Sequence, residues 1–219
     1  LLVFWSGTEY EQGMITDVTG ILLAGGKSRR MGEDKRFLHV GERTLFERSL
    51  AVLRSIFQDV LIVIAQDSPP LQADVAVIRD LVPDCGSLGG LYTGLSQATT
   101  DHVFVVACDM PFLNQQAVGY VTGLKQEADI VMAEGENGLQ PMHAVYSRRC
   151  LPVLEEMVRT HHLKIQDIVA NPSLKVRLIT MAELSRIDPE GRSFLNVNTP
   201  ADLEAARKLH RHPPDPHAH

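Results

Sequence analysis

The chain has 219 residues and a formal net charge of −6 at pH 7. This length fits one large α/β domain with a sizeable core, and the acidic balance disfavours nonspecific binding to nucleic acid. No apolar run approaches the roughly 20 residues of a membrane-spanning helix, and residues 1–13 lack the basic flank and long apolar region of a signal peptide. We therefore expect partners that are neither nucleic acid nor membrane.

The three cysteines, Cys85, Cys108 and Cys150, lie far apart and form no CxxC pair. An odd number of widely spaced cysteines argues against a disulfide framework and against a zinc site. This pattern predicts a protein of the reducing cytoplasm.

The two ends of the chain differ from the part between them. Residues 1–13 are interpreted as an N-terminal extension, residues 14–209 as the folded domain, and residues 210–219 as a disordered tail. The tail has four histidines and three prolines in ten residues, so metal binding by histidines is the alternative interpretation.

Between these ends, strand-like and helix-like segments alternate, and no linker or repeat divides them. This alternation predicts a single α/β domain of the Rossmann-like, doubly wound type, with a mostly parallel sheet and helices on both faces. Thr44 and Glu47 have the spacing of a capping box at the start of the first helix. Strands are expected at 18–23, 59–65, 73–79, 103–107, 130–133, 143–146 and 176–180, and helices at 44–57, at 114–125, 149–160, 164–170 and 200–209, and in a segment ending at 98.

The most informative stretch is Gly20–Lys35, which reads GILLAGGKSRRMGEDK. A short apolar run is followed by two glycines and then by the cations Lys27, Arg29, Arg30 and Lys35. Glycines let a phosphate approach backbone N–H groups closely, and the cations can bind its oxygens. A Walker loop would need a glycine five residues before Gly26, where Ile21 stands, and the GxGxxG spacing is also absent. The stretch is thus neither of these motifs; we expect it to hold a triphosphate, with a tight strand-to-helix turn that carries a solvated basic face as the alternative.

A single carboxylate follows the strongest buried-strand signal in the chain. Asp109 comes directly after VFVVAC, and Pro111 ends the strand geometry. Ligands bind at the carboxyl ends of strands where the strand order reverses, and Mg²⁺ typically takes one or two carboxylates plus substrate phosphates. We expect Asp109 to hold Mg²⁺, with capping of the next helix as the alternative.

Five motifs resemble those of the molybdenum cofactor guanylyltransferases, members of the sugar-nucleotide and cofactor nucleotidyltransferases, and the resemblance covers about residues 16–209. The basic loop is similar to the LAGGxxxRMGxDK signature of that family, and CDMP at 108–111 is similar to its CDxP motif. The resemblance implies a backbone cradle for the nucleotide at Leu23, Ala24, Gly25 and Gly26. It also implies catalytic roles for Arg30, Lys35 and Asp109, of which Lys35 and Asp109 bind nucleotide as well, and a magnesium ion on Asp109.

The other three motifs concern the base and the acceptor. Asp80 precedes a segment similar to the GPLAG-like loop of the family, and the resemblance places it in the guanine site; a strand-terminating turn is the alternative. The segment 138–146 resembles GxQPLxALY, which implies that Gln140 faces the acceptor, whereas His143 is interpreted as a packing residue. The segment 194–203 resembles FxNxNTPxDL, so Asn196 and Asn198 are expected to face one way and grip the acceptor, while Thr199 caps the last helix.

The resemblance implies Mg²⁺-dependent transfer of GMP from GTP to the molybdenum-bearing molybdopterin cofactor, with release of pyrophosphate. It further implies transient contact with molybdoenzymes or other cofactor-synthesis proteins. Ser87 and Gly89 depart from the proline and alanine of the family, and Gln66 is the only amide where an asparagine is usual. The alternatives are therefore a cytidylyltransferase or sugar-phosphate or methylerythritol-phosphate nucleotidyltransferase of the same fold, and a catalytically silent nucleotide-binding adaptor.

Overall fold

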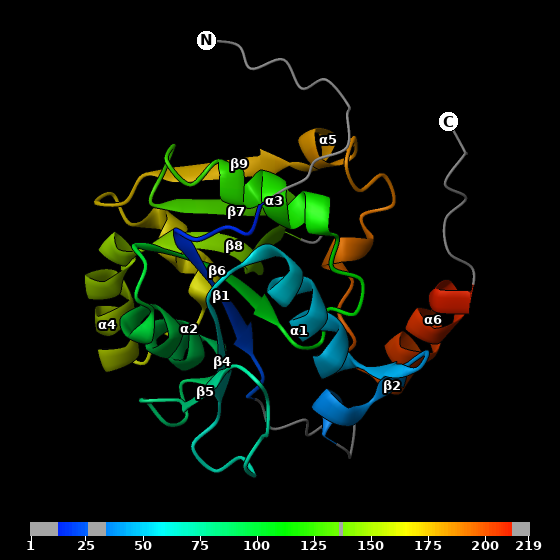
Figure 1. The fold of residues 1–219 in the computed structure, drawn as a ribbon. Helices are drawn as coiled ribbons and strands as arrows, with labels where there is room; N and C mark the ends of the chain where they lie inside the picture. Colours follow the sequence, from blue (N-terminus) through cyan, green and yellow to red (C-terminus); the bar gives the residue numbers. More distant parts are fainter. Residues whose placement is uncertain (1–12, 26–33, 136–137, 212–219) are drawn as a thin grey trace.

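The computed structural model of the chain describes residues 13–25, 34–135 and 138–211. A seven-stranded sheet in the order β5-β4-β1-β6-β8-β7-β9 forms its centre, and a two-stranded hairpin, β2-β3, lies to one side (Figure 1). The strands are β1 (Val18–Leu23), β2 (His39–Val40), β3 (Arg43–Thr44), β4 (Val60–Ile64), β5 (Ala76–Arg79), β6 (His102–Ala107), β7 (Ile130–Gly135), β8 (Gly138–Ser147) and β9 (Val176–Thr180).

The large sheet is mostly parallel, as predicted. β5, β4, β1 and β6 pair in parallel, as do β7 and β9, and only β8 runs antiparallel to its neighbours β6 and β7. The chain leaves β1 for β4 and β5 on one side and then returns to β6 on the other side. The strand order therefore reverses at β1, which is the position where sheets of this kind bind ligands.

Helices cover both faces of the sheet (Figure 1). One face carries the first, third and fifth α-helices, and the other carries the second and fourth. Alternate residues of each strand enter one of the two hydrophobic clusters: Leu22 and Phe104 lie in the first, and Ile21 and Val105 in the second. The helices are α1 (Leu45–Ile56), α2 (Gly86–Gln97), α3 (Gln115–Gly123), α4 (Leu151–Arg159), α5 (Met181–Leu184) and α6 (Pro200–Arg211).

The capping box predicted for α1 is present. Thr44 Oγ1 accepts a hydrogen bond from Glu47 N at 3.1 Å, and the Glu47 carboxylate accepts from Thr44 N at 2.8 Å. Two backbone donors at the helix start are satisfied in this way. Because Phe46, Leu50 and Leu53 lie on one stripe and are buried in the first hydrophobic cluster, α1 packs that face on the sheet.

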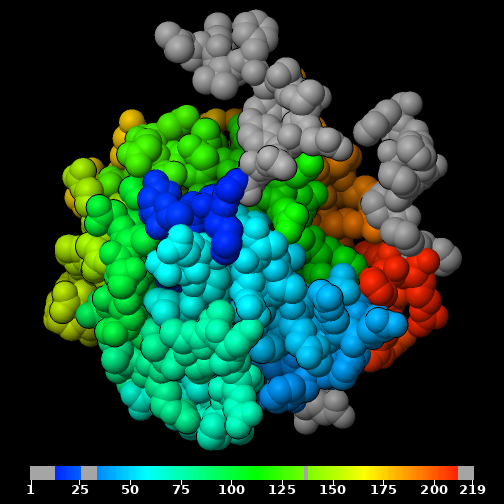
Figure 2. Space-filling model, viewed as in Figure 1, coloured from blue at the N-terminus to red at the C-terminus, as the bar shows by residue number. Residues whose placement is uncertain are grey.

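α6 packs against the hairpin and not against the sheet. Leu203 and Ala206 of α6 form a small cluster with Val40, Leu45 and Val197. Arg207 Nε also donates to the His39 carbonyl at 3.0 Å. The two segments lie side by side on the surface, as the light-blue and red atoms of Figure 2 show. The last helix thus fixes the position of the hairpin that follows Lys35.

Several predicted elements differ from the observed ones. The segment predicted as a helix at 164–170 is a 3₁₀ helix over Ile165–Ala170, and the strand predicted at 73–79 begins only at Ala76. The strand predicted at 143–146 is the second half of a longer strand, β8. The hairpin β2-β3 and the short helix α5 were not predicted, because two-residue strands and a four-residue helix are too short to show a hydrophobic period.

Across the described ranges, no helix is long and apolar enough to cross a membrane. The extension 1–12 and the tail 212–219 lie outside those ranges. The last helix continues to Arg211, two residues beyond the predicted domain boundary.

Candidate functional site

The site forms where β4, β1 and β6 end at one level. Leu23 is paired with Val63 on one side and with Ala107 on the other. Two further backbone hydrogen bonds extend this pairing into the loops: Ala24 N donates to the Val63 carbonyl at 2.8 Å, and Cys108 N donates to the Leu23 carbonyl at 3.1 Å. The backbone that leads into the basic loop and the backbone that leads into Asp109 are thereby fixed next to each other.

A pocket of about 410 Å³ opens on the β4 and β5 side of this edge. It brings together Leu23 and Gly25 with Gln66 and Asp80, four residues from three separate parts of the chain. Its size and its mixture of apolar walls and a few polar groups are typical of a small-molecule site. Leu23, Gly25 and Asp80, which were predicted to bind nucleotide, therefore line one cavity, and Gln66 lies in it as well.

Gly25 is in close contact with the backbone of the neighbouring loop. A Cβ added at Gly25 would lie 2.7 Å from Ala65 N, a distance that real Cβ atoms do not adopt. Leu23 and Ala24, by contrast, are buried. The glycine is needed here because the strand end and the Ala65 backbone touch with no room for a side chain.

Asp80 has a structural role in addition to its place in the pocket. Its Oδ1 accepts hydrogen bonds from Thr93 Oγ1 at 2.8 Å and from Val82 N at 3.0 Å. The second bond closes a turn after β5, as the alternative interpretation of Asp80 expected. A Cβ on Gly89 would lie 2.8 Å from Asp80 Oδ2, so the segment compared with the GPLAG-like loop is the close-packed first turn of α2.

Lys35 is oriented by an ion pair that sequence reasoning missed. Asp34 caps the 3₁₀ helix Lys35–Phe37 by accepting from Arg36 N at 3.0 Å, and its two oxygens also accept from Arg36 Nε at 3.0 Å each. Burial raises the pKa of Asp34, but the hydrogen bonds from Arg36 outweigh it and hold the pKa below its usual value. Arg36 is buried, and this pair anchors both neighbours of Lys35; the Asp-x-Arg spacing was the available signal.

Lys35 joins Asp109 to the segment before α6. Its Nζ donates to Asn198 Oδ1 at 2.7 Å and lies 3.6 Å from Asp109 Oδ2. The Asp109 carbonyl also accepts from Val197 N at 2.8 Å. Three residues predicted for the site, from three distant parts of the chain, therefore form one contact network.

Asp109 is a desolvated carboxylate at the rim of the sheet. Burial raises its pKa, and the nearby Lys35 only partly offsets this. Its Oδ1 is buried and has no hydrogen-bond partner among the described residues, which is rare for a buried carboxylate oxygen and calls for an explanation. Asp109 does not cap the next helix, because Asn114 accepts from Gln116 N and Ala117 N.

The remaining predicted acceptor residues lie less centrally. Asn196 and Asn198 are both exposed and flank the buried Val197, so they face one way, but Asn196 Nδ2 donates to the Phe194 carbonyl. Gln140 lies on β8 beyond the end of β6 and donates to the Gly138 carbonyl at 3.3 Å. No contact among the described residues joins Asn196 or Gln140 to Lys35 or Asp109.

Two side chains beside the site have purely structural surroundings. Thr199 Oγ1 accepts from Asp202 N at 3.2 Å, and the Asp202 carboxylate accepts from Thr199 N, so Thr199 caps α6 as predicted. His143 is fully buried between the rings of Phe104 and Phe194. Neither nitrogen of His143 has a hydrogen-bond partner within residues 13–25, 34–135 and 138–211, and its packing role matches the prediction.

Gly26 and Arg30, predicted for the cradle and for catalysis, lie outside the described residues, as do Lys27 and Arg29. The described part of the site, a strand-end cradle with a carboxylate and a lysine at a topological switch point, defines an α/β nucleotide-binding domain of the nucleotidyltransferase class. Residues 20–176 match the family model of the MobA-like NTP transferase domain. The chain belongs to this family.

Relatives of known name agree with this assignment. The chain is 37% identical to the molybdenum cofactor guanylyltransferase of Desulfosudis oleivorans, over 86% of this chain and 94% of that protein. It is 35% identical to the probable molybdenum cofactor guanylyltransferase of Pelotomaculum thermopropionicum, over 87% of this chain and 92% of that protein.

Solved structures show the same fold. Molybdopterin-guanine dinucleotide biosynthesis protein A of Archaeoglobus fulgidus superimposes with a TM-score of 0.74 at 25% identity, covering 88% of this chain and 98% of that one. The 2-C-methyl-D-erythritol 4-phosphate cytidylyltransferase of Thermus thermophilus superimposes with a TM-score of 0.61 at 19% identity, covering 87% and 98%. The second likeness shows the fold alone.

Proposed function

We propose that this protein transfers GMP from GTP to the terminal phosphate of the molybdenum-bearing molybdopterin cofactor and releases pyrophosphate. The network of Lys35, Asp109 and Asn198 at the end of β6, next to the strand-end pocket, is the observation that carries the proposal. The names of the relatives supply the two substrates. These names favour GTP over CTP, and they favour an enzyme over a silent adaptor.

We further propose that the reaction depends on Mg²⁺ held by Asp109. In the part of the chain that the structure describes, the buried Oδ1 of Asp109 has no hydrogen-bond partner, and a hard carboxylate oxygen in that state fits a hard cation. The described residues contain no cluster of three or more side chains able to hold a metal, so phosphates and water would complete the coordination. When bound, the ion would neutralise charge on the nucleotide phosphates.

The chain's own residues act by positioning and charge. An oxygen of the acceptor phosphate bonds to the α-phosphorus of GTP, and the bond from that phosphorus to the pyrophosphate oxygen breaks. Because the attacking group is already an anion, no strong general base is needed. The Lys35 ammonium stabilises negative charge that develops at the α-phosphate and the leaving group, and Arg30 is proposed to assist it. Leu23, Ala24, Gly25 and Gly26 are proposed to cradle the nucleotide phosphates.

GTP and the acceptor are proposed to bind on opposite sides of the network formed by Lys35, Asp109 and Asn198. The pocket lined by Gly25 and Asp80 takes the nucleoside, and a free oxygen of Asp80 can accept from the N1–H and N2–H₂ of guanine. Asn198, with Asn196 and Gln140 farther out, is proposed to bind the pterin side of the acceptor. The free thiols of all three cysteines agree with the reducing cytoplasm that we propose as its compartment.

A nucleotide screen tests the proposal. The melting temperature is measured with GTP, CTP, ATP and UTP, with and without Mg²⁺, since a ligand at 100 times its Kd stabilises the native state by roughly 2.7 kcal/mol. We expect the largest rise with GTP and Mg²⁺, and pyrophosphate release only after the molybdopterin cofactor is added. Nucleotide binding without any pyrophosphate release would instead favour the adaptor.

A further inference from the structure

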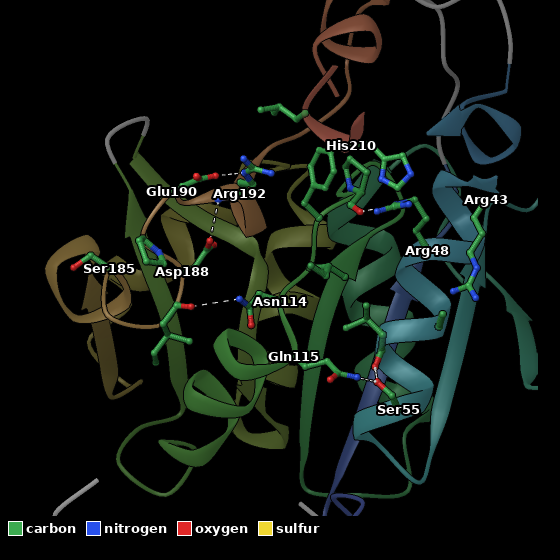
Figure 3. A pocket seen from close by; sticks show the side chains of 18 of the residues that line it. Arg43, Arg48, Ser55, Asn114, Gln115, Ser185, Asp188, Glu190, Arg192 and His210 are labelled. Carbon is green, nitrogen blue, oxygen red and sulfur yellow. Dashed lines mark hydrogen bonds and ion pairs between the residues drawn. The ribbon is translucent and has the colours of Figure 1, made fainter. Parts of the chain in front are cut away.

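A second and larger hollow lies away from the nucleotide pocket. It has a volume of about 1170 Å³ and shares no lining residue with that pocket. As Figure 3 shows, Arg43 and Arg48 line one side, the loop with Asp188 and Arg192 lines the other, and Asn114 lies between them. We call this hollow, bounded by β3, α1 and the segments 111–115 and 185–192, the arginine groove.

The groove is positively charged in an otherwise acidic chain. Both of its carboxylates are already used: Asp188 is buried and accepts from Ser193 N at 2.8 Å, and Glu190 pairs with Arg192. Among the described residues, no carboxylate lies within ion-pair distance of the other arginines of the groove, namely Arg43, Arg48 and Arg186. Three cationic side chains are therefore available to a partner.

Arg48 is the fixed point of the groove. Its Nε donates to the Pro111 carbonyl at 2.8 Å, its Nη1 donates to the Val40 carbonyl at 3.1 Å, and its guanidinium lies 5.6 Å from the centre of the Phe112 ring. These partners hold the guanidinium in place but do not neutralise it. Burial and the charge of Arg43 lower its pKa, so an anion brought to this point would relieve an existing repulsion.

The acidic side chain nearest in charge to Arg43 does not neutralise the groove. Glu47, whose charge reaches Arg43, is bound by Thr44 in the capping box of α1. An immobile guanidinium is also well suited to bind a carboxylate with two parallel hydrogen bonds. Little side-chain entropy would be lost on binding, because the two carbonyls already hold it.

The shape of the groove favours a peptide over a small anion. Its volume exceeds the roughly 300–1,000 Å³ typical of small-molecule sites, and apolar side chains of α1 and of the segment after Asp109 lie between the charges, among them Val52, Phe112 and Leu113. A partner segment that alternates carboxylates with apolar residues matches both properties.

We propose that the arginine groove is a docking surface for an acidic, partly apolar segment of another protein. The proposal does not depend on the transfer reaction, since Arg43, Arg48 and Arg186 lie outside the network of Lys35 and Asp109. One of the segments that line the groove begins at Pro111, two residues after Asp109. A docked partner would therefore lie against the loop that carries the Asp109 carboxylate.

The test uses the full chain and a fluorescent peptide in which pairs of glutamates and leucines alternate. Binding is followed by fluorescence anisotropy for the wild type, for the double variant Arg43→Glu/Arg186→Glu, and for the charge-matched control Arg159→Glu/Lys164→Glu. The control residues are exposed and belong to surface ion pairs on and after α4. The melting temperature of each variant reports whether it is folded.

We expect the wild type and the control to bind the peptide with the same Kd. The Kd of the groove variant should be higher by about tenfold or more, which corresponds to a loss of at least 1.4 kcal/mol in binding free energy. A peptide with glutamine in place of glutamate should not bind. Absence of saturable binding by the wild type, or equal losses in the two variants, would overturn the proposal. Equally tight binding of a DNA oligonucleotide would do the same, and so would a wild-type dimer that only the groove variant disrupts.

Discussion

Lys35 Nζ lies 2.7 Å from Asn198 Oδ1, although 163 positions of sequence separate the two residues. This hydrogen bond places the cation that follows the basic loop against the segment that opens α6. Because Lys35 is also 3.6 Å from Asp109 Oδ2, a single ammonium group lies between the proposed metal ligand and the proposed acceptor side. Its removal should affect both.

We predict that Lys35→Ala lowers kcat/KM for transfer by about 10²–10³-fold, the usual loss when one group that stabilises developing charge is removed. The acid limb of the pH–rate profile should also move to higher pH, because loss of Lys35 removes the group that holds down the pKa of Asp109. Steady-state kinetics between pH 5 and 9 measure both effects. Lys125→Ala, which removes a cation paired with the remote Asp17, is the control and should change neither.

Asp109→Asn should abolish Mg²⁺-dependent turnover while leaving the protein at least as stable as the wild type. The amide keeps the shape of the carboxylate but lacks the charge that burial disfavours. Turnover at saturating Mg²⁺ and the melting temperature without nucleotide are the two measurements. Near-normal activity would remove Asp109 from the metal site, whereas a large fall in melting temperature would make its role structural.

Gly25→Ala should weaken GTP binding by about tenfold or more, because a Cβ 2.7 Å from Ala65 N forces the strand end and the neighbouring loop apart. Gly123→Ala is the matched control, since nothing lies within 4 Å of a Cβ at that position. Calorimetric titration with GTP compares the two variants. Equal affinities would show that the pocket adapts to a side chain at Gly25.

His143 should make the protein less stable in acid. Burial lowers its pKa to about 4 from an ordinary 6.5. Between these two pH values His143 is therefore protonated in the unfolded chain and neutral in the folded chain. The stability is therefore full above pH 6.5 and is lost as the pH falls to 4, by about 3 kcal/mol for this group.

Urea unfolding at pH 7 and at pH 4.5 measures this loss. His143→Leu keeps the packing between Phe104 and Phe194 and should remove most of the difference between the two pH values. His161→Asn, a change at an exposed turn position with φ of 58°, should leave the difference intact. The same loss in all three proteins would assign it to other groups.

Local patterns were sufficient for much of this fold. The end of β1 was predicted because the apolar run at 21–23 is followed by Ala24 and two glycines, and the capping box of α1 is encoded within four residues. The direction of β8 could not be predicted, because an apolar run looks the same in a parallel and in an antiparallel strand.

Site residues could be predicted where their role follows from neighbours in sequence. They could not be predicted where their role depends on contacts between segments that are far apart in sequence. The place of Asp109 at a strand end follows from its own neighbours in sequence. The bond from Lys35 to Asn198 and the packing of His143 between Phe104 and Phe194 depend on contacts between distant segments. The Asp34–Arg36 pair that orients Lys35 is local in sequence and was missed. Asp80 was predicted for the base, and the structure adds its turn and its bond to Thr93.

The central claim is the transfer of GMP, and direct detection of the product tests it. The protein is incubated with Mg²⁺, the molybdopterin cofactor and an equal mixture of GTP and CTP, and the products are identified by mass spectrometry for the wild type and for Asp80→Ala. The account predicts the guanine dinucleotide form of the cofactor together with pyrophosphate, and a loss of the GTP preference in Asp80→Ala. A cytosine dinucleotide from the wild type, or no dinucleotide at all, would contradict it.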